Sequence, residues 1–136
     1  MSDEKRAILR AYGAQVVITP MVDPDHPMSH YNVSKRIAEQ TPGAFLVNQF
    51  FNPDNATQHY KVTGPEIWKQ MDGKIDMLVG GAGTGGTLSG CAKYLKEQNS
   101  SVKVFCADPI GSILYDMYYH KKIVDPPGSY KVEGIG

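Results

Sequence analysis

A glycine-rich turn at residues 80–90, with the sequence GGAGTGGTLSG, is the feature that most limits what this chain can fold into. It follows the apolar run IDMLVG, which predicts a strand, and it precedes residues 87–98, where apolar side chains recur with helical spacing. Glycines at such a turn let backbone N–H groups approach a ligand at the positive end of the helix dipole. The turn therefore predicts an α/β fold with a phosphate site, or, on a purely structural interpretation, a tight packing corner.

Helical and strand-like segments alternate along the rest of the chain. Helices are predicted over residues 2–13, 29–40, 63–71 and 87–98, and strands over 15–20, 44–50, 75–80 and 102–109. Ser29 is expected to cap the second helix, and Thr63-x-x-Glu66 reads as a capping box for the third. Residues 51–60 and the chain after 110 are expected to be loops. This alternation predicts a parallel sheet with ligands beyond the carboxyl ends of its strands.

Composition excludes several function classes. Fourteen basic and fourteen acidic residues cancel, which argues against nucleic-acid or membrane-surface binding driven by charge. No apolar run reaches the roughly 18–20 residues of a membrane span, and the four histidines are scattered, so no metal site is expected. Cys91 and Cys106 lack C-x-x-C spacing, so two buried, reduced thiols in a cytoplasmic protein are expected.

A dinucleotide site competes with a simple phosphate cradle. Gly81 to Gly86 read G-x-G-x-x-G, and Asp108 follows at the end of the next predicted strand, where an acid would bind a ribose hydroxyl. However, the usual fingerprint belongs to a first βαβ unit, whereas two βα units are predicted before this one. The segment GTGGT also supplies two threonines and a double glycine, which favour one phosphate monoester over a pyrophosphate.

Several segments resemble fold-type II pyridoxal-phosphate enzymes, and within them the cystathionine β-synthase and cysteine synthase family. GTGGTLSG after the strand IDMLVG resembles the family's phosphate loop. Four other segments agree in order and spacing, and the last two lean toward cystathionine β-synthase: MSDEKRAILRAYGAQVVITP, NQFFNPDNATQHYKVTGPEIW, DPIGSIL and YKVEGIG. The resemblance implies part of a three-layer αβα fold, tryptophan synthase β-like, with a mostly parallel sheet. Residues 1–42 would belong to a movable N-terminal subdomain and 43–136 to the larger, phosphate-binding domain.

The resemblance also implies a pyridoxal 5′-phosphate site, residue by residue. The cradle for the cofactor phosphate would consist of Gly83, Thr84, Gly85, Gly86 and Thr87. The backbone turn near the cofactor ring would be Gly134, Ile135 and Gly136. Gln49 would help to hold the substrate carboxylate, and Phe50 takes the aromatic position beside it.

In this family the Schiff-base lysine and the Ser/Thr/Asn loop that binds the substrate carboxylate lie upstream of the segment beginning MSDEK, and the Ser at the pyridine nitrogen lies downstream of G-I-G. We therefore expect the chain to be the central piece of a longer enzyme. Residues 1–136 would contain no catalytic residue and would be inactive alone, because no lysine in them has an S-x-K-x-R-like setting.

The resemblance implies that the full enzyme condenses serine with homocysteine to cystathionine, a transsulfuration reaction of cysteine biosynthesis. Its partners would be small amino-acid substrates and a second copy in a homodimer, with no nucleic acid or membrane. Cysteine synthase, which uses O-acetylserine and sulfide, is the alternative within the family. An NAD-binding Rossmann module and a non-catalytic interaction protein are the alternatives from other classes.

Overall fold

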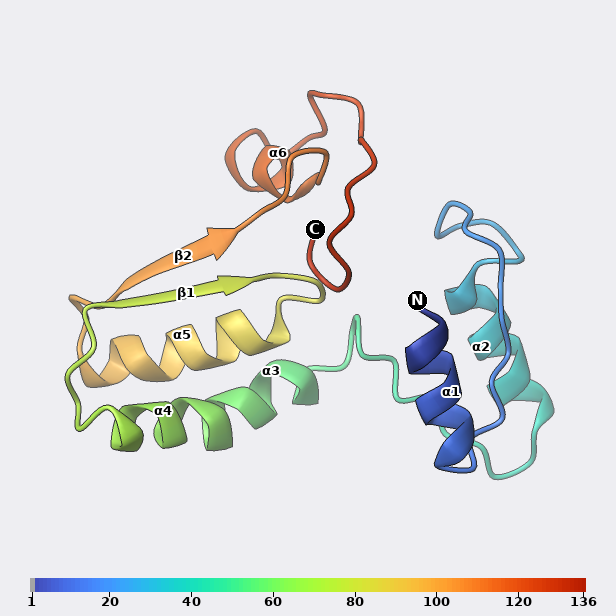
Figure 1. Cartoon of the computed structure of the whole chain (residues 1–136), viewed down its shortest axis with the longest axis horizontal. Helices are drawn as coiled ribbons and strands as arrows, with labels where there is room; N and C mark the ends of the chain where they lie inside the picture. The colour runs from blue at the N-terminus through green and yellow to red at the C-terminus, as the bar shows by residue number, and fades with distance from the viewer. Residues whose placement is uncertain (1) are drawn as a thin grey trace. The chain divides into compact units, whose positions relative to one another are not determined.

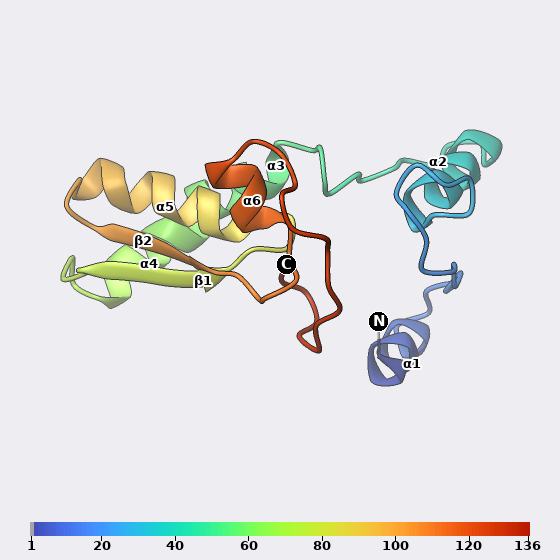
Figure 2. The same cartoon turned by 90° about the horizontal axis from the view of Figure 1, so that it is seen from above.

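The chain divides into two compact units, Met1–Asn48 and Gln49–Gly136, in a computed structural model that describes residues 2–136 (Figures 1 and 2). No helix among the described residues is long and apolar enough to cross a membrane. The assignment of residues 1–42 to a movable subdomain, and of 43–136 to a larger domain, stays a prediction.

The first unit contains two helices, α1 (Asp3–Ala11) and α2 (His30–Gln40), which confirms the two predicted there. Gly13 follows α1 with a φ of 84°, and its N–H donates to the Arg10 carbonyl, so it ends the helix as a left-handed glycine does. The Ser29 Oγ accepts a hydrogen bond from the Asn32 N–H at 3.1 Å, so the predicted N-cap of α2 is also confirmed.

Two predicted strands in the first half of the chain are wrong. Among the described residues, 15–20 and 44–50 form no strand, and the sheet consists of β1 and β2 alone. Their β-branched and apolar residues indicate a preference for extended backbone, but a strand exists only where a neighbouring chain completes its hydrogen bonds. The sequence pattern reports the preference for extended backbone, but it does not report whether a neighbouring strand is present to pair with.

A continuous helical segment opens the second unit, where a loop was predicted for residues 51–60. It consists of α3 (Asp54–Gln58), a π-helical turn η1 (His59–Thr63) and α4 (Gly64–Gln70). The Asn52 Oδ1 accepts from the Asp54 N–H at 2.9 Å, and Asp54 places a negative charge in the first turn. These two polar residues start a helix, although their types also suit a loop.

The predicted capping box at Thr63 is wrong, because Thr63 lies inside this helical segment rather than at its start. Its hydroxyl lies 2.9 Å from the Nδ1 of His59, one turn earlier. The carboxylate of Glu66 accepts from the Gln70 amide at 3.2 Å instead of reaching back to the backbone. A π-turn inside an α-helix is uncommon and frequently accompanies a functional site.

A parallel β–α–β unit forms the centre of the second unit, which confirms the predicted α/β class. Strands β1 (Met77–Gly81) and β2 (Lys103–Ala107) pair in parallel, and α5 (Gly86–Gln98) connects them. The views in Figures 1 and 2 show α5 and α4 on the same face of this sheet. The buried apolar core consists of Cys91, Leu95 and Val102, and burial raises the pKa of the Cys91 thiol.

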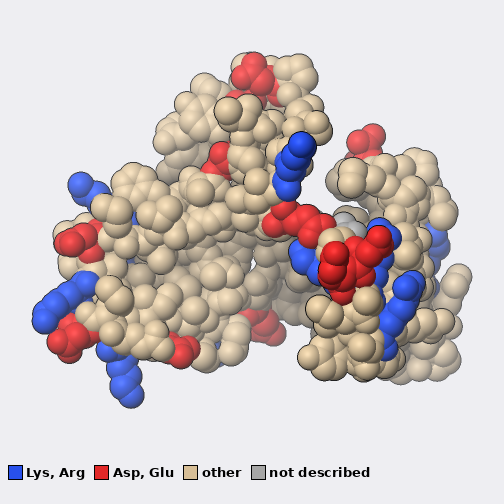
Figure 3. All heavy atoms as spheres, in the orientation of Figure 1, with Lys and Arg blue, Asp and Glu red and all other residues tan. Residues whose placement is uncertain are grey.

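The opposite face of the sheet carries exposed apolar side chains. Val79 and Phe105 are register partners, and they are 60% and 49% exposed. Cys106, which follows Phe105 and so points to the other face of β2, is also exposed, and the prediction of two buried thiols is therefore wrong for this residue. Its register partner is Gly80, which has no side chain to cover it. Basic and acidic residues are interspersed on the face seen in Figure 3, without a large basic patch.

A short helix, α6 (Leu114–Tyr119), lies in the region predicted to be loop. Asp116 is buried, and its Oδ2 accepts from the backbone N–H groups of Asp125 at 2.9 Å and Val124 at 2.7 Å. These two hydrogen bonds fasten the segment after α6 and hold the pKa of the Asp116 carboxyl below its ordinary value.

Acid is expected to release this segment. Because the folded pKa is lowered, the Asp116 carboxylate stabilises the fold above the unfolded pKa of about 4, and this stabilisation disappears as the pH falls through the lower folded value. Hydrogen exchange of the Val124 and Asp125 amides should accelerate, relative to intrinsic rates, below about pH 4. Asp116→Asn should remove this pH dependence, and unchanged protection down to pH 2 in the native protein would contradict it.

Candidate functional site

The turn between β1 and α5 leaves backbone donors unused at the start of a helix. Gly85 is the N-cap of α5, with a φ of 80° that favours glycine. The first hydrogen bond of the helix runs from the Ser89 N–H to the Gly85 carbonyl at 2.9 Å. The N–H groups of residues 86–88 therefore precede the helical ladder and point outward at the positive end of the helix dipole. This is the backbone arrangement that binds anions.

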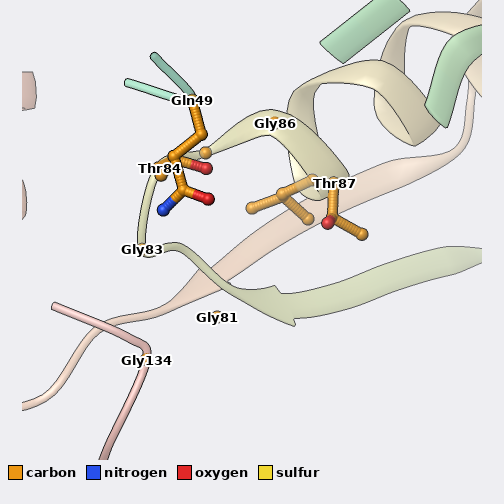
Figure 4. A pocket seen from close by; sticks show the side chains of 9 residues that line it. Gln49, Gly81, Gly83, Thr84, Gly86, Thr87 and Gly134 are labelled. Atoms are coloured by element: carbon orange, nitrogen blue, oxygen red, sulfur yellow. The ribbon is translucent and has the colours of Figure 1, made fainter. Parts of the chain in front are cut away.

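A pocket of about 250 Å³ opens at this turn (Figure 4). Its lining combines the turn with residues from two distant segments: Gln49, Gly81, Gly83, Thr84, Gly85, Gly86, Thr87, Leu88 and Gly134. None of these carries a positive charge, so an anion here would rely on backbone N–H groups and the two threonine hydroxyls.

Two glycines of the turn are required by close contacts. A Cβ at Gly86 would collide with the side-chain oxygen of Asn55, and a Cβ at Gly83 would collide with the carbonyl of Gly134. The backbone of the turn is thus pressed against α3 on one side and against the C-terminal segment on the other. The glycines therefore permit tight packing, as the purely structural interpretation of the turn expects, and they also shape the pocket.

Both threonine hydroxyls of the turn contact the helical segment behind it. The Nδ2 of Asn55 donates to the Thr84 Oγ1 at 2.9 Å. The Nε2 of His59 lies 3.0 Å from the Thr87 Oγ1. Asn55 and His59 do not line the pocket, but each touches a hydroxyl that does.

The pocket brings together all five residues of the predicted phosphate cradle and some of the other predicted site residues. Residues 83–87 line it with Gln49 and Gly134. The side chain of Ile135 lies against Gly81, and the Gly136 N–H donates to the Ala82 carbonyl at 2.9 Å, so both hold the C-terminal turn beside the pocket without lining it. Phe50 does not line the pocket and is 52% exposed. The roles assigned to these residues stay predictions.

Asn55 and His59 were missed by the sequence analysis. They lie four residues apart, which puts them on one face of a helix, but residues 51–60 were expected to be a loop, where such spacing has no meaning. The Asn55 Nδ2 also donates to the Gln49 carbonyl at 2.9 Å. The only available signal was the polar i, i+4 pair itself.

Asp108, the acid proposed for a dinucleotide ribose, has a structural partner. Its Oδ2 accepts from the Tyr115 N–H at 3.0 Å near the start of α6, and it does not line the pocket. The dinucleotide hypothesis therefore lacks, at this pocket, the acidic residue that would bind the ribose hydroxyl.

The glycine turn, the helix dipole and the two hydroxyls give this α/β unit an arrangement that suits a phosphate. The chain belongs to the pyridoxal-phosphate dependent enzymes, a family that it matches over residues 1–136. The fold-type II class and the pyridoxal phosphate cofactor are thereby confirmed for its family. The residues fit the cofactor's phosphate, because the N–H groups of residues 86–88 precede the first hydrogen bond of α5 and the hydroxyl-bearing Thr84 and Thr87 line the same pocket.

Individual relatives come from two enzyme groups. The chain is 44% identical over its whole length to cystathionine β-synthase of Apis mellifera and 39% identical to cysteine synthase 3 of Caenorhabditis elegans. It also superimposes, with a TM-score of 0.86 and 37% identity over 99% of its length, on the crystal structure of an O-acetylserine dependent cystathionine β-synthase from Helicobacter pylori. The chain covers 27%, 38% and 41% of these three proteins.

Proposed function

We propose that this chain supplies the phosphate cradle and part of the substrate site of a pyridoxal-phosphate enzyme that catalyses β-replacement on small amino acids. The observation that carries the proposal is the pocket at the start of α5, which unites residues 83–87 with Gln49 and Gly134. Family membership supplies the cofactor, and the pocket supplies a set of donors that suits its phosphate.

Each part of the pocket has a distinct proposed role. The N–H groups of residues 86–88 and the hydroxyls of Thr84 and Thr87 bind the phosphate dianion and thereby hold the cofactor in place. Gln49, on the rim of the same pocket, donates to a substrate carboxylate. The C-terminal turn at 134–136 lines the approach to the ring, and Phe50 shields the substrate side. The bound cofactor supplies the electron sink for the reaction.

For the full enzyme we propose condensation of serine with homocysteine to cystathionine, a transsulfuration step in cysteine biosynthesis. Support comes from the segments DPIGSIL and YKVEGIG and from the cystathionine β-synthases among the relatives. Cysteine synthesis from O-acetylserine and sulfide is the second candidate, which the cysteine synthase of C. elegans favours. A reducing compartment such as the cytoplasm suits the two free cysteines.

A homodimer is also proposed for the full enzyme, and residues 1–136 alone are expected to self-associate because their exposed sheet face offers apolar side chains for burial. Met77, Val79 and Phe105 lie on this face and are each about half exposed or more. Sedimentation velocity should show concentration-dependent self-association of the chain. A sharp melt from a protein that stays monomeric at high concentration would contradict this expectation.

Residues 1–136 alone are expected to give no measurable β-replacement, because the resemblance places the Schiff-base lysine outside them. Mass spectrometry should detect neither cystathionine from serine and homocysteine nor cysteine from O-acetylserine and sulfide. Turnover by the purified 136-residue chain that depends on added pyridoxal phosphate would refute this expectation.

Ligand binding tests the proposed cradle independently of turnover. Pyridoxine 5′-phosphate is the suitable probe, because it lacks the aldehyde that reacts with surface lysines. Calorimetry should show that it binds at least about 10-fold more tightly than pyridoxine, since the phosphate accepts several charge-assisted hydrogen bonds. Equal affinity for the two compounds would refute the cradle. Tight NADH binding that is lost in Asp108→Ala would establish the dinucleotide site instead.

A further inference from the structure

One helical face holds both threonine hydroxyls of the turn. Asn55 in α3 contacts Thr84, and His59 in η1 contacts Thr87. The two contacting residues lie four apart, so they project from the same side of the segment. Gly90 in α5 lets the two elements approach closely, because a Cβ there would lie 2.8 Å from the His59 Cβ. Neither contact is explained by a generic need to fill space, since each joins polar atoms at about 3 Å.

The direction of the first hydrogen bond is fixed by chemistry. An amide nitrogen can only donate, so the Thr84 oxygen must accept from Asn55. The hydroxyl proton of Thr84 is then available to a third group. The second amide proton of Asn55 is donated to the carbonyl of Gln49, the residue proposed to bind the substrate carboxylate. Asn55 therefore contacts both Thr84 and Gln49.

The second hydrogen bond can run in either direction, depending on the tautomer of His59. A neutral imidazole has one donor and one acceptor nitrogen. With the proton on Nε2, the ring donates to Thr87 and accepts from the Thr63 hydroxyl through Nδ1, and the proton of Thr87 stays available. With the proton on Nδ1, Thr87 must donate to the ring. It would then present only lone pairs to a phosphate, which repels them.

We propose that Asn55 and His59 are positioning residues that commit both threonine hydroxyls to donate toward the bound phosphate, with His59 in its Nε2–H tautomer. The proposal rests on the phosphate cradle proposed above and deepens it. It assigns the helical segment 54–63 a role in cofactor recognition, with the Thr63 hydroxyl as the hydrogen-bond partner of the His59 Nδ1.

Nitrogen NMR of the histidine ring tests the tautomer directly. In the ¹⁵N-labelled chain, the His59 resonances should show a protonated Nε2 and an unprotonated Nδ1 at neutral pH, assigned by their loss in His59→Gln. A protonated Nδ1 with an unprotonated Nε2 would overturn the proposal. The measurement needs neither ligand nor turnover.

A matched pair of His59 variants tests the donor. His59→Gln places an amide nitrogen near the position of Nε2, whereas His59→Asn reaches only the position of Nδ1. The affinity for pyridoxine 5′-phosphate should stay within about 3-fold in the Gln variant and fall about 5- to 10-fold in the Asn variant, the equivalent of one ordinary hydrogen bond. Equal losses in the two variants would indicate space filling and would overturn the proposal.

Double-mutant cycles test whether each residue acts through its threonine. Asn55→Ala should weaken binding in the native background but not in Thr84→Val, and His59→Asn should behave likewise with Thr87→Val. Additive losses would overturn the positioning role even where the native chain prefers the phosphate-bearing probe. If the native chain shows no such preference, the cradle itself fails, so the two failures are distinguishable. Circular dichroism of each variant establishes that the fold is retained.

Discussion

Gly86→Ala is expected to weaken binding of pyridoxine 5′-phosphate by about 100-fold or more. The added Cβ would collide with the whole Asn55 side-chain amide, which donates hydrogen bonds to Thr84 and to the Gln49 carbonyl, so either this amide is displaced or the first turn of α5 moves away from α3. Either change breaks the contact of Asn55 with Thr84, and movement of the turn also misaligns the N–H groups of residues 86–88. Several hydrogen bonds to a charged group, each contributing about 1.5–3 kcal/mol, would be lost together. Isothermal calorimetry measures the change.

Gly80→Ala is the matched control for this variant. Its Cβ would meet only the Leu88 Cδ1, at 3.2 Å, and the end of a leucine side chain can move. The control should bind within about 3-fold of the native chain. Thr87→Val gives a second, milder measure that leaves the backbone in place, with an expected loss of about 10-fold. Native affinity in both Gly86→Ala and Thr87→Val would contradict the cradle.

Gly90→Ala, which adds a single methyl group, is expected to lower the stability of the fold strongly. Gly90 is buried where α5 crosses the helical segment, and a Cβ there would collide with the Ala56 carbonyl and lie 2.9 Å from the Tyr60 backbone nitrogen. Backbone atoms cannot move aside as a side-chain end can. We expect the free energy of unfolding to fall by about 2–3 kcal/mol, even though alanine favours a helix by about 1 kcal/mol over glycine. Urea denaturation measures it.

Gln98→Ala in the same helix is the control, since Gln98 is exposed and should change stability by less than about 0.5 kcal/mol. Stabilisation by Gly90→Ala, as the helix propensity alone predicts, would show that α5 and η1 are not in close contact. Because His59 lies against Gly90, the variant should also weaken phosphate binding.

The sequence predicted those parts of the fold whose cause is local. The turn at 80–90 requires glycine at each close approach, the N-cap Ser29 satisfies its own helix, and α5 shows its buried stripe through Cys91 and Leu95. The succession of strand, glycine turn and helix start also predicted an anion site at this turn, whereas the individual cradle residues 83–87 were named from the family resemblance.

The remainder depends on partners that sequence patterns do not specify. Residues 15–20 and 44–50 have strand-like composition, yet pairing decides whether a strand forms. The segment around Asn55 and His59 is rich in polar residues that suit both a loop and a helix. Packing of α3 and η1 against α5, through glycines at 86 and 90, favours the helix. The contacts of Asn55 and His59 with the two threonines therefore became visible only in the folded chain.

Amide chemical-shift mapping tests the central claim most directly. The ¹⁵N-labelled chain is titrated with pyridoxine 5′-phosphate and, separately, with pyridoxine. The largest shifts with the phosphate-bearing compound should fall on the N–H groups of residues 85–88, with smaller changes at Gly134 and at the Gln49 side chain. Pyridoxine should leave residues 85–88 nearly unchanged. Shifts that avoid the start of α5, or that are the same with and without the phosphate, would contradict the assignment of this turn as the phosphate cradle.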